Sequence, residues 1–78
     1  MDAPRLTFHY DRAGDILTIA RRPPHAGQEC EDLGDDVVAR VDPATGEVEG
    51  IEVLFFSTRL LRSDDFALPI EAELRRVA

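Results

Sequence analysis

The sequence is poor in the features that mark several common protein classes. Its single cysteine, Cys30, has no partner for a disulfide within the chain, which excludes a disulfide-stapled framework. Residues 1–20 contain no long apolar run after a basic start, so we expect neither a signal peptide nor a membrane span, and we expect a cytoplasmic protein. Lysine is absent, and we attribute the use of arginine at all nine basic positions to genome composition.

Motifs for catalysis and for metal binding are missing as well. The sequence has no serine-nucleophile motif, no glycine-rich phosphate loop and no dinucleotide-binding fingerprint. His9, His25 and Cys30 are the only metal-ligand types besides carboxylates, and their spacing matches no zinc pattern. We therefore expect no metal, no cofactor and no enzymatic activity.

The length of 78 residues corresponds to a single domain, residues 1–78, with a small core. A chain this short buries only about 60–65% of the surface that it exposes when unfolded. Hydrophobic residues make up 44% of the chain and charged residues 32%, which is typical of a folded protein. We expect the small core to be supplemented by self-association, most simply as a homodimer.

A first β-hairpin is predicted over residues 5–20. Leu6, Phe8 and Tyr10 alternate with polar residues, as they do in a strand with one buried face. Residues 11–15 have the composition of a turn, and a short apolar run follows them. A connection this short joins antiparallel strands.

A second hairpin is predicted over residues 37–56, and it forms the centre of the expected fold. The residues from Asp42 to Gly46 separate two runs rich in β-branched side chains. The two hairpins predict an antiparallel sheet of about four strands. Residues 28–33 leave open a short edge strand, because short length and charged residues are typical of sheet edges.

The last strand of the second hairpin is apolar on both faces. Ile51, Val53 and Phe55 are expected on one face. The residues expected on the other face are Val48, Gly50, Leu54 and Phe56, with Glu52 among them. Such a strand needs cover on both sides, which a helix and a second subunit would supply. Residues 57–62 are compatible with a short helical turn.

The C-terminal segment favours a helix. Pro69 suits the first helical position, and Ile70, Leu74 and Val77 follow at helical spacing. Alternating apolar residues leave a strand open for residues 69–78. The predicted fold class is therefore α+β, with an antiparallel sheet of about four strands in two hairpins and a short C-terminal helix.

Negative charge is concentrated in one part of the chain. The net charge is −7, and residues 28–52 contain nine acidic residues and one arginine. This field repels phosphate backbones, so nucleic-acid binding is not expected, and it attracts basic proteins. The alternative interpretation is a solvated loop that keeps the protein soluble. The candidate partner-binding residues are Glu29, Glu31, Asp32, Asp35 and Asp36.

Glu52 is a second candidate because an acid between apolar residues of a central strand is costly to bury without a partner. In a pocket with Tyr10 and His9 it would give a small enzyme or ligand-binding domain. The simpler interpretation is an ion pair with Arg40 across the hairpin.

Several of these residues carry a family resemblance. They are Tyr10-Asp11, Ala13, Asp15, Leu17, Ile19, Val37 to Val41, Asp42, Gly46 and Gly50-Ile51-Glu52-Val53-Leu54. This pattern resembles the small bacterial and archaeal family called domain of unknown function 2283, over residues 6–61. Gly14 departs from the family pattern, and the tail from Ser63 lies outside it.

The resemblance implies a protein without established catalytic activity. Some members of the family are encoded beside proteins similar to RelE-like ribonuclease toxins, which implies an antitoxin-like role. Such toxins are basic, so the acidic segment has the charge that would complement them.

Overall fold

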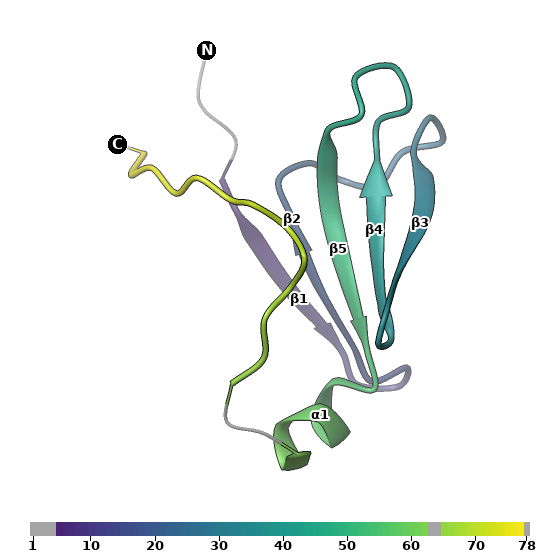
Figure 1. Cartoon of the computed structure of the whole chain (residues 1–78), viewed down its shortest axis with the longest axis vertical. Coiled ribbons are helices and arrows are strands. Elements are labelled where there is room, and N and C mark those ends of the chain that lie inside the picture. The colour runs from purple at the N-terminus through teal and green to yellow at the C-terminus, as the bar shows by residue number, and fades with distance from the viewer. Residues whose placement is uncertain (1–4, 63–64, 78) are drawn as a thin grey trace.

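The fold is a five-stranded antiparallel sheet followed by one short helix. The computed structural model describes residues 5–62 and 65–77. The elements are β1 (Thr7–Asp11), β2 (Ile16–Ala20), β3 (Glu29–Gly34), β4 (Val37–Val41), β5 (Val48–Leu54) and α1 (Phe56–Arg62). The strand order in the sheet is β1-β2-β5-β4-β3 (Figure 1). The predicted α+β class is confirmed, but the sheet has five strands and not four, because the acidic segment forms the edge strand β3.

The antiparallel register divides the sheet into two faces. Leu17 lies opposite both Tyr10 and Val53, and Val53 in turn lies opposite Val37. We call the face that carries this row the inner face. The neighbouring row, on the outer face, consists of His9, Thr18, Glu52 and Val38.

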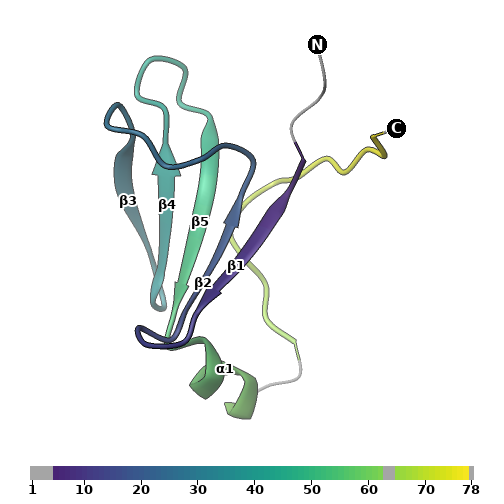
Figure 2. The same ribbon diagram turned by 180° about the vertical axis from the view of Figure 1, so that it is seen from behind.

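The hydrophobic core lies on the inner face. Its buried apolar side chains, among the described residues, are those of Val37, Ala39 and Val53. Figures 1 and 2 show α1 at one end of the sheet and the C-terminal tail crossing one face of the sheet, which is the inner face. The ring of Phe56 packs edge-on against that of Tyr10, with the ring centroids 5.9 Å apart, and against that of Phe66, with the centroids 6.4 Å apart. These contacts join the sheet, the helix and the tail.

The chain leaves β5 through a residue in the left-handed region. Phe55 has a φ of 53°, and its side chain is exposed. The strand therefore ends at Leu54, and Phe55 does not continue the row of Ile51 and Val53 that the alternation predicted. The reversal directs the next residue, Phe56, against Tyr10 at the start of α1.

The tail differs from the predicted helix. The short helix is α1, and residues 65–77 form neither helix nor strand; residue 78 lies outside the described residues. Phe66, Leu68 and Ile70 are half-buried, whereas the residues between them are exposed. This period of two fits an extended chain that turns alternate side chains toward the body of the protein, and a helix would turn one of them away.

The turns of the second hairpin follow the sequence prediction. Gly46 has a φ of 75° and donates its backbone N–H to the carbonyl of Asp42 at 2.7 Å. The Asp42 carboxylate accepts a hydrogen bond from the N–H of Ala44 at 2.9 Å. A glycine tolerates this left-handed conformation without strain, and the aspartate stabilises the turn locally.

Among the residues that the structure describes, no helix is long and apolar enough to cross a membrane.

The position of Val53 makes a direct prediction about stability. Val53 is fully buried, so Val53→Ala removes two methyl groups from the core and should lower the free energy of unfolding by about 2 kcal/mol. Leu61, which is 88% exposed, provides the control, because Leu61→Ala should change the free energy of unfolding by less than about 0.5 kcal/mol. Urea denaturation followed by circular dichroism measures both. Equal effects of the two substitutions would contradict the placement of the core.

Candidate protein-binding surface

The acidic segment forms one edge of the sheet. Glu29, Glu31 and Asp32 lie on β3, which in the described sheet pairs with β4 alone, and Asp35 and Asp36 lie in the turn between these strands. All five residues are exposed. The register places Glu29 and Glu31 toward the inner face and Asp32 toward the outer face. We call these five residues the acidic edge.

Three successive residues with positive φ fix the turn of the acidic edge. The φ angles of Gly34, Asp35 and Asp36 are 84°, 52° and 61°. Aspartate is among the few residues other than glycine that enter this region readily. The Asp32 carboxylate accepts the N–H of Gly34 at 2.8 Å, and the carbonyl of Asp36 accepts the N–H of Leu54 at 2.8 Å. The turn is therefore held both locally and by the end of β5.

Asp35 differs from the other acids because it is paired inside the molecule. The buried Arg59 of α1 donates from Nη1 to Asp35 Oδ2 at 3.0 Å and from Nη2 to the Asp35 carbonyl. The guanidinium also stacks over the ring of Phe66, 4.9 Å from its centroid. Within the described part of the chain, the other four acids of the edge form no ion pair. Sequence reasoning missed Arg59, since nothing local in the helix indicates a partner in the turn.

Glu52 forms the ion pair that its simpler interpretation predicted. Arg40 Nη2 lies 2.5 Å from Glu52 Oε1 on the outer face, and both side chains are partly shielded from solvent. His9 is in the same row as Glu52, but Thr18 of β2 lies between them. Tyr10 is on the inner face. The structure therefore does not bring Tyr10, His9 and Glu52 together.

The hydroxyl of Tyr10 instead contacts Asp15, which connects the first hairpin to the helix. Asp15 Oδ1 accepts hydrogen bonds from the Tyr10 hydroxyl at 2.7 Å and from the Ser57 N–H at 3.0 Å, and Oδ2 accepts one from Ser57 Oγ at 2.7 Å. The Asp15 carbonyl accepts the N–H of Phe56. The bonds from Ser57 and Tyr10 lower the pKa of Asp15, and the bond to Asp15 raises the pKa of Tyr10. The sequence pattern included Tyr10 and Asp15, but nothing in it indicated that Asp15 would contact Ser57.

A second anchored carboxylate holds the connection that leads into β3. Glu49 is only 3% exposed and lies where the register of β4 and β5 shifts. Its Oε1 accepts a hydrogen bond from Gln28 at 3.1 Å and lies 2.8 Å from His25 Nε2, and its Oε2 lies 3.4 Å from Arg22 Nε. The bonds from Gln28 and His25 lower the pKa of Glu49. Figures 1 and 2 show this connection crossing the ends of β5 and β4.

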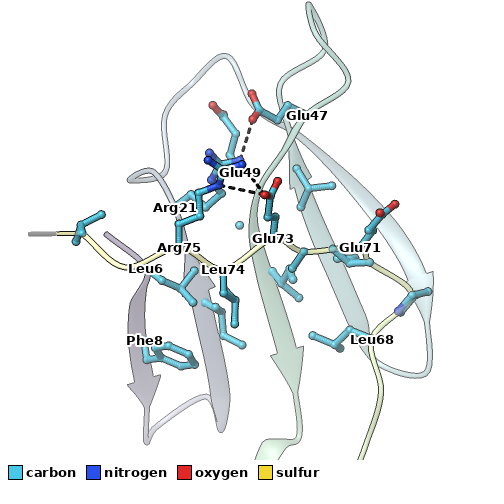
Figure 3. Close-up of a pocket in the computed structure, with 18 residues that line it drawn as sticks. Leu6, Phe8, Arg21, Glu47, Glu49, Leu68, Glu71, Glu73, Leu74 and Arg75 are labelled. Atoms are coloured by element: carbon cyan, nitrogen blue, oxygen red, sulfur yellow. Dashed lines mark hydrogen bonds and ion pairs between the residues drawn. The ribbon is translucent and has the colours of Figure 1, made fainter. Parts of the chain in front are cut away.

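A groove separates the tail from the inner face. It has a volume of about 820 Å³ and is lined on the sheet side by β1, β2 and β5 and on the other side by the tail. Figure 3 shows Leu74 of the tail beside Leu6, with Phe8 below them. In the described residues, no group of three or more histidine, cysteine, aspartate or glutamate side chains is arranged to hold a metal ion.

The strands and the start of the helix match a known protein family. A family model described as protein of unknown function (DUF2283) matches residues 7–57. The matched region runs from β1 into the first turn of α1 and includes the acidic edge, the Arg40–Glu52 pair and the contacts of Asp15 with Ser57. No curated protein and no solved structure matches the chain.

The lowered pKa of Asp15 and of Glu49 predicts loss of stability in acid. A carboxylate whose pKa is lower in the folded state stabilises the fold above its unfolded pKa of about 4, and this contribution is lost as the pH falls through the folded value. Thermal unfolding between pH 7 and pH 2 should show a falling midpoint. Asp15→Asn, which tolerates the positive φ, should lower the midpoint at pH 7 and reduce its dependence on pH.

The exposed Glu31 supplies the matched control for this measurement. Glu31→Gln should leave the wild-type dependence on pH almost unchanged, because this carboxylate has no hydrogen-bond partner in the described part of the chain. If both substitutions changed the pH dependence of the unfolding midpoint equally, general charge repulsion, and not the contacts of Asp15, would govern acid unfolding.

Proposed function

The chain belongs to the DUF2283 family of proteins of unknown function, and we propose that it is a cytoplasmic, non-enzymatic interaction domain that binds a basic protein through its acidic edge. The observation that carries the proposal is the position of four acids, without an ion pair among the described residues, on and beside an edge strand that pairs on one side and is free on the other. An edge strand offers a row of free backbone donors and acceptors, and its side chains select what can pair with it. Here those side chains select for positive charge.

The charge of the edge favours a foreign partner over a second copy. Two β3 strands paired with each other would bring Glu29, Glu31 and Asp32 close to their own copies, and like charges opposite each other are destabilising. A basic strand or loop would meet complementary charge instead, which increases the association rate and the specificity. The ion pair between Asp35 and Arg59 supports the same surface, since it fixes the turn beside β3 to the body of the protein.

A toxin of the RelE-like kind is the partner that fits this chemistry and the family resemblance. Such a toxin carries the positive charge that the acidic edge would meet. Binding would give the chain an antitoxin-like role that needs no catalytic group of its own. Self-association as a homodimer is a separate proposal, because the acidic edge is unsuited to it.

Reversing the charge of the edge tests the proposed surface. Glu29→Lys/Glu31→Lys should weaken binding to a purified, catalytically inactivated RelE-like toxin by about tenfold, because attraction at the edge becomes repulsion. Isothermal titration calorimetry at two salt concentrations measures the affinity. Wild-type binding should weaken at the higher salt concentration, because ions screen exposed charges.

The tail offers a matched control for the charge reversal. Glu71→Lys/Glu73→Lys changes the net charge by the same amount at exposed positions outside β3 and should leave the affinity within about twofold of wild type. Equal weakening by both double substitutions would mean that net charge, and not the acidic edge, governs binding. Absence of wild-type binding at low salt would refute the RelE-like partner.

A further inference from the structure

The two edges of the sheet have opposite character. The edge at β3 is acidic, whereas β1 has the sequence Thr7-Phe8-His9-Tyr10-Asp11, with one acid at its end. Natural sheets protect edge strands with charges, prolines or a covering segment. All five residues of β1 are exposed, Thr7 to Tyr10 include no acid, arginine or proline, and no segment that the structure describes pairs with the free side of the strand. A neutral, exposed edge of this kind is suited to pair with another strand.

Apolar side chains gather along the same edge. Phe8 is 62% exposed, and Leu6 and Tyr10 beside it are also exposed. Leu74 of the tail is 81% exposed and lies next to Leu6 (Figure 3). These side chains lie on the inner-face side of the edge, where a pairing strand would cover them. A cluster of exposed large apolar residues at one place is a mark of an interaction surface.

We propose that β1 pairs antiparallel with β1 of a second copy of this chain, about a twofold axis at Phe8. This register places Phe8 opposite the partner's Phe8 and Leu6 opposite the partner's Tyr10. It also places Arg5 opposite the partner's Asp11, so that the twofold axis generates two opposite-charge pairs across the interface. Each of these pairs joins residues of the same face, as antiparallel pairing requires.

The charges of β1 select this register over its neighbour. An axis at His9 would place Leu6 opposite the partner's Arg12 and would leave Arg5 without an acid opposite it. The axis at Phe8 gives each charge at the ends of the strand an opposite charge on the partner, and it places the aromatic rings at the centre of the interface. A second copy is therefore the occupant that this edge fits, because its own ends supply the complementary charges.

The pairing leaves the acidic edge free. Two five-stranded sheets joined at β1 form one continuous sheet whose outer strands are the two copies of β3. The dimer would present its two acidic edges at opposite ends. The inference does not depend on the proposed function, since it concerns the opposite edge of the sheet.

Charges introduced at Thr7 and His9 test the register. These two exposed side chains form no hydrogen bond in the described structure and would lie opposite each other across the axis. Thr7→Glu/His9→Glu would create two like-charge pairs and should raise the dissociation constant of the dimer by about tenfold. Thr7→Lys/His9→Glu would create two opposite-charge pairs and should restore wild-type association. Light scattering over a range of concentrations should show the wild-type mass rising toward twice the 8.7 kDa of the monomer.

A cysteine placed on the axis tests the same register without electrostatics. In a Cys30→Ser background, Phe8→Cys would bring two thiols together at a Cα separation of about 4.5–5.5 Å, within disulfide range. Air oxidation should yield a covalent dimer that reducing agent reverses. Leu61→Cys in the same background is the matched control, and its exposed thiol should cross-link far less.

Three results would overturn the proposal. A wild-type protein that stays at the monomer mass at every concentration would exclude the pairing. A dimer that withstands Thr7→Glu/His9→Glu in a variant whose circular dichroism spectrum is unchanged would use another surface. Equal cross-linking of the Phe8→Cys and Leu61→Cys proteins would show that the axis does not lie at Phe8.

Discussion

A small core constrains the rest of this structure. Only Val37, Ala39 and Val53 are buried large or branched apolar residues or alanines in the described chain, and all three lie on one face of the sheet. Burial on this scale cannot position every loop and the helix by packing alone. Hydrogen-bonded carboxylates take over this role. Asp15 and Asp35 hold α1 from two different turns, and Glu49 holds the connection between β2 and β3.

Two groups of acidic residues therefore have different roles. The acids that accept hydrogen bonds from distant segments stabilise the fold. Asp35 is an example, because it pairs with the buried cation of Arg59, which also lies over the ring of Phe66. The acids along β3 contribute little to internal contacts and leave their charge in solvent. The net charge of −7 includes both groups, so it does not by itself show which acids leave their charge in solvent.

Sequence reasoning predicted the features that depend on local chemistry. The second hairpin followed from Asp42 and Gly46, and the ion pair of Arg40 with Glu52 followed from their places on adjacent strands. The count of strands was wrong because charged residues weakened the strand signal of β3. The face on which a side chain lies depends on register, and a shift of one residue exchanges the faces. For this reason the sequence could not show that Tyr10 and Glu52 lie on opposite faces.

The tail failed as a prediction for a related reason. Ile70 and Leu74 fit both the helical and the alternating period, so the sequence alone did not decide between them, and the tail follows the surface on which it lies. The inner face has its buried core on β4 and β5 and a groove over β1, β2 and β5, and this surface accommodates an extended chain. The same incomplete cover leaves Leu6, Phe8 and Leu74 exposed at β1. Covering them by self-association would couple dimer formation to folding through mass action, so that stability would rise with protein concentration. A domain of this size would then gain from a second copy the burial that its own chain is too short to provide.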